Sequence, residues 1–278
     1  MATPTSPPDT LVPDARGRLS ARYEQAFAYA RRTDYVPATT DQLLPVDVMG
    51  ALVLRDEQGN ATDLSELHRS WSWFIHYAWS NNRYAGILAP WRHGKTMLGT
   101  IRYGLWEIGK NPELRVRLLA ADDREAMQRV KAMGRYITES PEYKLIFPDI
   151  QPDRKANWNE HQLYVKRKGL APDPTLHAAA AFSSEAGGGN DLILVDDACT
   201  YQNSILQPPK REKIYQALTS VWLRRVQPET RVLLVGTAWH EKDAYSQLRA
   251  LRGGKWLWLI QAVGPPPDFA PISSVVEG

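Results

Sequence analysis

The sequence predicts an α/β protein in which a mainly parallel β-sheet is covered by helices on both faces. From Tyr84 onward, short apolar runs alternate with longer amphipathic segments, and strands that are buried on both faces of a parallel sheet have this apolar pattern. The chain of 278 residues is also long enough to bury a sizeable core. Its 43% hydrophobic and 23% charged residues are ordinary for a globular protein.

The expected elements can be placed in order along the chain. Helices are predicted over 20–32 and 62–80, the second with Asp63 or Ser65 as a possible N-cap, and the proline-containing stretch between them is expected to run over the surface. The remaining elements are apolar strands at 84–90, 116–121, 192–195, 232–235 and 256–263, helices at 95–109, 123–139 and 209–224, and a hairpin formed by 161–167 and 175–182.

Composition excludes several classes of protein. Cys199 is the only cysteine, which rules out an internal disulfide or a cysteine-rich zinc site and favours a reducing, cytosolic setting. No stretch has the roughly 18 apolar residues of a membrane span, and the polar, proline-rich N-terminus does not have the pattern of a secretory signal. The net charge of +3 is compatible with nucleic acid contact but does not argue for it, because the basic residues are spread along the chain.

Ten tryptophans are a notable feature of the composition. Core and interface packing is the favoured role, and stacking on nucleic acid bases is the alternative. The clustered ones are Trp71, Trp73, Trp79, Trp256 and Trp258.

The strongest local motif follows the first apolar strand and begins a helix. It reads Pro90-Trp91-Arg92-His93-Gly94-Lys95-Thr96. A loop in this place directs backbone N–H groups and a helix N-terminus at one point, which suits a phosphate chain. Gly94 permits close approach of the backbone, Lys95 can reach the β- and γ-phosphates, and the Thr96 hydroxyl can ligate Mg²⁺. A plain loop-to-helix junction is the alternative.

Two further motifs lie at the ends of later apolar strands. Asp196 and Asp197 end the run at 192–195, where one carboxylate can hold Mg²⁺ and the next can orient and deprotonate a water. The alternative is a helix-capping pair. Thr237 ends the run at 232–235 and is placed to sense a γ-phosphate, or simply to start a tight turn. Together the three motifs predict a nucleotide site.

With these motifs in order, the region from about Tyr84 to Leu251 resembles the ATPase domain of tailed-bacteriophage terminase large subunits. The Pro90–Thr96 loop is similar to the family's variant Walker A loop, which lacks the early glycine and carries an arginine. Leu194-Val195-Asp196-Asp197 resembles its Asp-Asp form of Walker B. The segment from Gly236 to Asp243 is similar to its coupling motif, although an arginine is more usual at the position of Ala238.

The resemblance implies a RecA-like P-loop fold that binds ATP through the whole Pro90–Thr96 loop, with Mg²⁺ held by Thr96 and Asp196. It implies the following catalytic residues: Asp197, Arg92, Lys95 and Thr237. Asp197 replaces the more usual glutamate and is one methylene shorter, which puts the hydrolysis rate in question. Arg92 is expected either to stabilise charge on the γ-phosphate or to form a salt bridge with the Asp pair.

Other candidate residues follow from the same resemblance. Thr237 and His240 match the segment that couples hydrolysis to DNA movement. His93 and His240 are lone loop histidines, so no metal is assigned to them. The stretch His76–Arg83 is the candidate for adenine recognition, but its letters favour a plain helix.

Two loop features leave alternatives open. Arg224 and Arg225 are candidates for binding a neighbour's ATP or a DNA phosphate. The alternative is that they form a solvated helix end. Whether these two residues and Arg92 act in their own subunit or in a neighbouring one is left open. The Gly187-Gly188-Gly189 loop is either a connector or a segment that moves between nucleotide states.

The expected organisation is a flexible arm and helical extension over 1–60, an ATPase domain over 61–263 and a proline-rich tail or linker over 264–278, with no nuclease domain in this chain. The resemblance implies that the protein moves double-stranded DNA into a procapsid in the host cytoplasm. The implied partners are the portal protein, the terminase small subunit, a nuclease domain or subunit on another chain, and further copies in a ring. The expected ring is a pentamer when working, and a monomer in solution is the alternative state. A helicase-type ATPase and a weakly hydrolysing nucleotide-binding regulatory subunit are the rival functions.

Overall fold

A computed structural model of the chain describes residues 21–32, 42–56, 58–153, 155–156, 158–183, 188–251, 254–261 and 275–277. The helices are α1 (Ala21–Ala30), α2 (Pro45–Val53), α3 (Glu66–Ser80), α4 (Arg102–Lys110), α5 (Asp123–Glu139), α6 (Pro141–Ile146), α7 (Pro209–Gln216) and α8 (Ala244–Arg249). Three of the described segments are π-helices: η1 (Lys95–Ile101), η2 (Gln202–Leu206) and η3 (Ala217–Trp222). One is a 3₁₀ helix, η4 (Leu223–Arg225). The strands are β1 (Tyr84–Leu88), β2 (Val116–Ala120), β3 (Gln162–Leu163), β4 (Leu176–Ala180), β5 (Leu192–Asp196), β6 (Arg231–Gly236), β7 (Trp256–Ile260) and β8 (Val275–Glu277).

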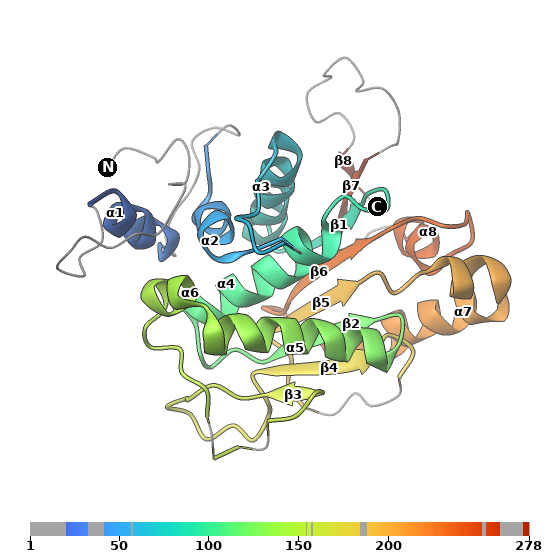
Figure 1. Cartoon of the computed structure of the whole chain (residues 1–278). Helices are drawn as coiled ribbons and strands as arrows, with labels where there is room; N and C mark the ends of the chain where they lie inside the picture. The colour runs from blue at the N-terminus through green and yellow to red at the C-terminus, as the bar shows by residue number, and fades with distance from the viewer. Residues whose placement is uncertain are drawn as a thin grey trace.

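The described residues form an eight-stranded sheet in the order β3-β4-β2-β5-β6-β1-β7-β8 (Figure 1). The inner strands from β4 to β7 are all parallel, while β3 and β8 pair antiparallel at the two edges. Strand β6 lies between β1 and β5. The carboxyl ends of β1, β5 and β6 therefore meet at one edge of the sheet, which is where ligands bind in open α/β folds.

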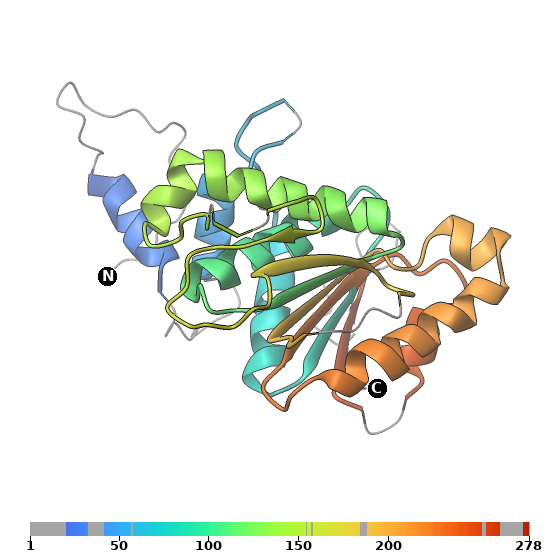
Figure 2. The ribbon, with the colours of Figure 1, turned by 90° about the horizontal axis from the view of Figure 1, so that it is seen from below.

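Two apolar clusters cover the two faces of the sheet, because successive side chains of a strand point to opposite sides. On β1, Ala85 and Ile87 join the cluster that contains α1 to α5, while Leu88 joins the cluster that contains α7, η3 and α8. Figure 2 shows α5 on one side of the sheet and α7 on the other. The predicted RecA-like α/β class, with a mainly parallel sheet and helices on both faces, is confirmed.

Most predicted elements are present, but the stretch before α3 differs from the expectation. Residues 45–53 were expected to run over the surface, yet they form helix α2, and all of its residues are buried. Pro45 occupies the first turn, where a missing N–H costs nothing, and the Asp47 carboxylate accepts the Leu44 N–H at 3.0 Å. The prediction was wrong because α2 is apolar on nearly every side, a pattern that marks a fully enclosed helix.

The chain ends of the predicted domain plan are only partly described. The arm over residues 1–19 and most of the tail lie outside the described residues. Within the expected tail, β8 adds an antiparallel strand to β7. No helix among the described residues is long and apolar enough to span a membrane.

The tryptophans named above mainly serve packing. Trp71, Trp256 and Trp258 are buried, and the half-buried Trp79 donates its indole N–H to the Val232 carbonyl at 3.1 Å. The half-buried Trp73 stacks on Tyr77. A tryptophan that does stand in solvent is Trp91, which is 67% exposed in the loop after β1.

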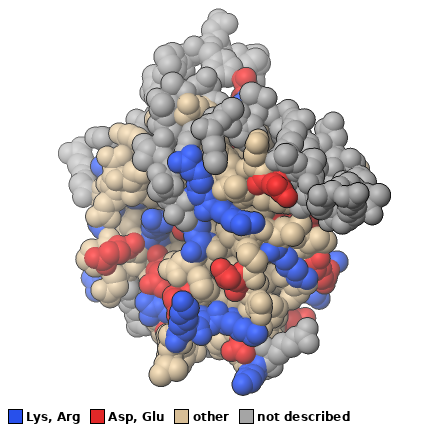
Figure 3. All heavy atoms as spheres, turned by 90° about the vertical axis from the view of Figure 1, so that its left-hand side faces the viewer, with Lys and Arg blue, Asp and Glu red and all other residues tan. Residues whose placement is uncertain are grey.

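Charged side chains do not form a one-signed surface on the face drawn in Figure 3. Basic and acidic groups are interspersed there. This face gives no electrostatic argument for or against a polyanionic partner.

Candidate nucleotide site

The loop after β1 has the backbone shape of an anion cradle. Arg92 and Gly94 have positive φ angles of 63° and 71°, and helical structure begins at Lys95. Such left-handed residues just before a helix turn neighbouring N–H groups toward one point. A Cβ on Gly94 would lie 3.2 Å from Leu98 and would also be strained by the positive φ. The requirement for glycine expected from the sequence therefore has a steric basis.

Lys95 lies inside this loop rather than in solvent. Its side chain is 3% exposed, and its ammonium donates to the Pro90 carbonyl at 2.8 Å and lies 4.0 Å from Oδ2 of Asp197. Burial lowers the pKa of Lys95, whereas Asp197 and Asp196 act to raise it. The amine is therefore held against the loop backbone and the end of β5.

Thr96 and Asp196 are brought together from separate elements. The Thr96 hydroxyl donates to Oδ2 of Asp196 at 3.0 Å, and Thr100 donates to Oδ1 at 2.9 Å. Asp196 is fully buried at the last position of β5. Hydroxyl and carboxylate oxygens are ligands that Mg²⁺ prefers, so these two residues fit the predicted metal site in their chemistry and in their place beside the phosphate loop.

Asp197 follows directly and adopts a left-handed backbone with φ of 45°, which is uncommon for a residue with a side chain. Its own N–H donates to the Val235 carbonyl at 2.9 Å, and its Oδ1 accepts the Thr237 N–H at 3.0 Å. Burial raises the pKa of the Asp197 carboxyl to about 6, although Lys95 acts to lower it. A carboxylate with raised proton affinity is suited to take a proton from water.

Thr237 links the loops after β6 and β1. Its hydroxyl donates to the Ala89 carbonyl at 3.3 Å, while its N–H holds Asp197. Farther along, Asp243 caps α8 by accepting the Ser246 N–H. The geometry thus places Lys95, Thr96, Asp196, Asp197 and Thr237 at one edge of the sheet, as the three motifs predict.

Arg92 does not form the salt bridge that was one of its two expected roles. It is exposed and stacks over the Trp91 ring, with its guanidinium carbon 4.6 Å from the ring centroid. The arginine that does pair with Asp196 is Arg129 of α5, whose Nε donates to Oδ2 of Asp196 at 2.9 Å. Sequence reasoning missed Arg129. A signal was present, because α5 follows β2, whose carboxyl end neighbours that of β5.

The two candidate histidines, His93 and His240, contact different residues. Nδ1 of His93 lies 3.0 Å from the Trp91 carbonyl, and the ring of His240 accepts from Arg211 at 3.1 Å. His68 of α3 reaches the loop, with Nε2 3.2 Å from the His93 carbonyl. Ser65 is at the N-cap position of α3, but its hydroxyl bonds the His68 ring rather than a helix N–H.

The structure also places the stretch His76–Arg83, the candidate for adenine recognition. His76–Arg83 covers the end of α3 and leads into the amino end of β1, whereas the phosphate loop follows its carboxyl end. The opposite end of α3, at His68, touches the phosphate loop. The plain-helix interpretation of the stretch is therefore confirmed for residues 76–80.

Arg224, Gly188 and Gly189 lie at the amino edge of the sheet, before β6 and β5. Arg224 is exposed in η4 shortly before β6, and the side chain of Arg225 is outside the described residues. Gly187 is also outside them. Gly189 packs so closely on Arg115 that a Cβ would lie 1.8 Å from its guanidinium, and Gly188 has φ of 86°. Both described glycines of this loop therefore lie against side chains, Gly188 against Asp173 and Gly189 against Arg115.

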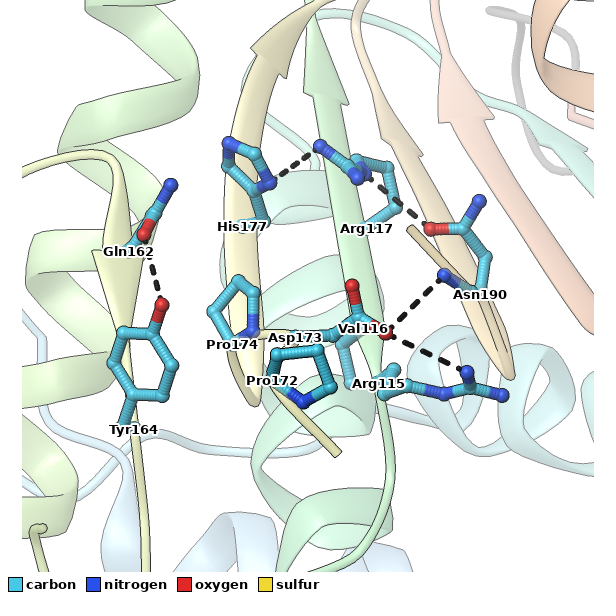
Figure 4. A pocket seen from close by; sticks show the side chains of 11 residues that line it. Arg115, Val116, Arg117, Gln162, Tyr164, Pro172, Asp173, Pro174, His177 and Asn190 are labelled. Carbon is cyan, nitrogen blue, oxygen red and sulfur yellow. Dashed lines mark hydrogen bonds and ion pairs between the residues drawn. The ribbon is translucent and has the colours of Figure 1, made fainter. Parts of the chain in front are cut away.

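A cavity of about 370 Å³ lies at this amino edge, away from the phosphate loop (Figure 4). Its lining includes Arg115, Arg117, Tyr164, Asp173, His177 and Asn190. Figure 4 shows the guanidinium of Arg117 between His177 and Asn190, at 2.6 Å and 3.3 Å. Since β2, β4 and β5 begin here, the cavity is separate from the nucleotide site.

His177 should make stability depend on acid pH. Burial, followed by the charge of Arg117, lowers its pKa from 6.5 to about 4. The unfolded chain therefore takes up a proton that the folded chain excludes, and stability present above pH 6.5 is lost as pH falls to 4. We expect a loss of about 2 kcal/mol, allowing for partial exposure. Denaturant unfolding at both pH values checks this, with His177→Gln as the less pH-sensitive variant. If the free energy of unfolding falls equally with pH in the variant and in the unaltered protein, the expectation is wrong.

The sheet order, with helices on both faces, defines the class of protein as an α/β protein with a RecA-like fold. The chain is similar in structure to the large terminase of bacteriophage HK97, with 16% sequence identity and a TM-score of 0.46, over 81% of this chain and 40% of that one.

Two further solved structures are also similar. One is a DEAD box protein from the hyperthermophile Methanococcus jannaschii, with 13% identity, a TM-score of 0.38, and coverage of 67% of this chain and 47% of that one. The other is Dbp5 of S. cerevisiae bound to Gle1, with 13% identity, a TM-score of 0.37, and coverage of 64% and 42%. The chain thus spans less than half the length of each of these proteins. No protein-family model and no curated protein matches it.

Proposed function

We propose that this chain is a Mg²⁺-dependent ATPase. The observation that carries the proposal is the meeting of the loop after β1 with the ends of β5 and β6. There, Lys95 approaches Asp197 to 4.0 Å and Thr96 bonds Asp196 at 3.0 Å. A phosphate cradle, a metal-binding pair and a buried carboxylate are the parts that phosphoryl transfer to water needs.

Each residue has a role that follows from its contacts. Lys95 and the N–H groups of the Pro90–Thr96 loop bind the β- and γ-phosphates. Thr96 and Asp196 would hold Mg²⁺, which supplies charge neutralisation of the phosphate oxygens when bound. Asp197 orients a water and accepts its proton, and Thr237 keeps the Asp197 carboxylate in place.

Arg92 is proposed to act from the exposed tip of the loop. Its guanidinium rests on Trp91 and is free of the Asp pair, so it is available to bind phosphate oxygens of its own subunit or of a neighbour. In such reactions an arginine stabilises the negative charge that develops on the γ-phosphate in the transition state.

We further propose that the ATPase is the packaging motor of a tailed-bacteriophage terminase large subunit, which moves double-stranded DNA into a procapsid. The support is the resemblance of the three motifs at Pro90–Thr96, Leu194–Asp197 and Gly236–Asp243. The proposed partners are the portal protein, the terminase small subunit, a nuclease on another polypeptide and further copies of the chain in a ring. Work of this kind takes place in the host cytoplasm.

Steady-state ATP hydrolysis by the whole chain, with and without Mg²⁺ and double-stranded DNA, tests both parts. Hydrolysis that requires Mg²⁺, disappears in Lys95→Ala and rises with DNA supports the motor. Hydrolysis that ignores duplex DNA but responds to single-stranded nucleic acid favours a helicase-type ATPase. ATP that binds but is not hydrolysed under any of these conditions favours a nucleotide-sensing subunit.

A further inference from the structure

Asp196 shares one of its carboxylate oxygens between two donors. Oδ1 accepts only the Thr100 hydroxyl among the described residues, at 2.9 Å. Oδ2 accepts the Thr96 hydroxyl at 3.0 Å and Nε of Arg129 at 2.9 Å. Because Thr96 is the other proposed metal ligand, Oδ2 is the oxygen turned toward the metal position. Arg129 therefore occupies the same side of the carboxylate that Mg²⁺ would use.

Two cations cannot share this oxygen without a large electrostatic cost. The Asp196 side chain is fully buried and that of Arg129 is 18% exposed, so water screens their surroundings weakly. A guanidinium beside a divalent cation in such a place is strongly repelled. Direct ligation of Mg²⁺ by Oδ2 would therefore displace Arg129 from that oxygen.

Arg129 has a second acceptor one helical turn away. Its Nη2 lies 3.5 Å from the Glu125 carboxylate, and its Nη1 donates to the Glu125 carbonyl at 3.3 Å. The two residues are four apart on α5, the spacing at which oppositely charged side chains meet on a helix. A rotation of the Arg129 side chain can transfer the guanidinium from Asp196 to Glu125 without exposing an unpaired charge.

We propose that Arg129 competes with Mg²⁺ for Oδ2 of Asp196, and that Glu125 receives the guanidinium when the metal and nucleotide bind. Arg129 is thus a positioning residue. It keeps the buried Asp196 carboxylate paired and sets the Mg²⁺ concentration at which nucleotide binds tightly. This inference rests on the proposed nucleotide site and adds a regulated step to it.

The test is the binding of ADP to the whole chain, by calorimetry, over a series of free Mg²⁺ concentrations. In Arg129→Gln we expect half-maximal tightening of ADP binding at about tenfold lower Mg²⁺, the size expected when a competing charge-assisted bond is lost. In Glu125→Gln we expect about threefold higher Mg²⁺, because the guanidinium loses its second acceptor. The two variants therefore shift the same quantity in opposite directions.

Arg135→Gln is the matched control. Arg135 lies on the same helix and faces Glu139 at 3.6 Å with the same spacing, but the two side chains are 71% and 64% exposed. We expect no change in its Mg²⁺ dependence. Circular dichroism checks that Arg129→Gln folds, and the partly exposed Glu125 supplies an independent variant.

An unchanged or raised Mg²⁺ requirement in Arg129→Gln overturns the competition while leaving the nucleotide site intact. If the unaltered chain binds no ADP at any Mg²⁺ concentration, the proposed ATPase and this inference both fail. The wild-type titration therefore tests the nucleotide site, and the Arg129→Gln titration tests the competition.

Discussion

Asp197→Asn should lower the turnover number for ATP hydrolysis by about a hundred- to ten-thousandfold, the usual contribution of a general base. Asparagine keeps the shape of the side chain and can still accept the Thr237 N–H, which Oδ1 of Asp197 now accepts at 3.0 Å. It cannot take a proton from water. Nucleotide binding should be retained or tightened, because a negative charge near the phosphates is removed. Single-turnover hydrolysis and an ADP titration of the same variant separate the two effects.

Asp149→Asn provides the control for this charge change, since Asp149 is exposed and far along the chain from the site. Its turnover should match that of the unaltered protein. If Asp197→Asn hydrolyses ATP at the wild-type rate, Asp197 is not the base and another group must activate the water.

Arg102→Met should cost about 3–5 kcal/mol of unfolding free energy, the loss typical of breaking a buried ion pair. Arg102 of α4 is fully buried and bonds Asp47 of α2 at 2.8 Å and Ser72 of α3 at 2.8 Å. Burial raises the pKa of Asp47, and Arg102 opposes that rise. Without Arg102, the buried Asp47 carboxylate keeps its hydrogen bonds from Ser72 and Leu44 but loses the cation that bonds it directly. Denaturant unfolding of the variant measures the loss directly.

A double-mutant cycle identifies the source of this loss. Asp47→Asn combined with Arg102→Met should destabilise by less than the sum of the single changes, because no unpaired charge remains. The exposed pair Arg135–Glu139 is the surface comparison, and Arg135→Ala should cost less than about 1 kcal/mol. Strict additivity in the buried cycle would mean that Arg102 stabilises the fold through packing alone.

The Arg102 network also ties the N-terminal helices to the site. Helix α4 continues directly from η1, which begins at Lys95 in the phosphate loop. Asp47 and Ser72 therefore fix α2 and α3 to the same helical unit that carries Lys95, Thr96 and Thr100. Loss of this anchor should loosen the phosphate loop together with the fold.

The sequence by itself determined the type and order of most elements. The apolar runs at 192–195 and 232–235 became β5 and β6, and the amphipathic stretch at 123–139 became α5 with the same bounds. Periodicity and caps are local properties of the chain, so they can be recognised without a structure. The sequence also placed Lys95, Asp196 and Thr237 in one site, because the carboxyl ends of parallel strands share an edge.

Only the tertiary structure decided which groups surround that site. The pairing of Arg129 with Asp196 joins residues 67 positions apart, and the burial of α2 depends on α1, α4 and α6 packing against it. The exposure of Arg92 on Trp91, rather than its pairing with the Asp pair, follows from the left-handed turn of the loop and from Arg129 already occupying Asp196. Such contacts arise from the packing of distant segments, which leaves no periodic signal in the chain.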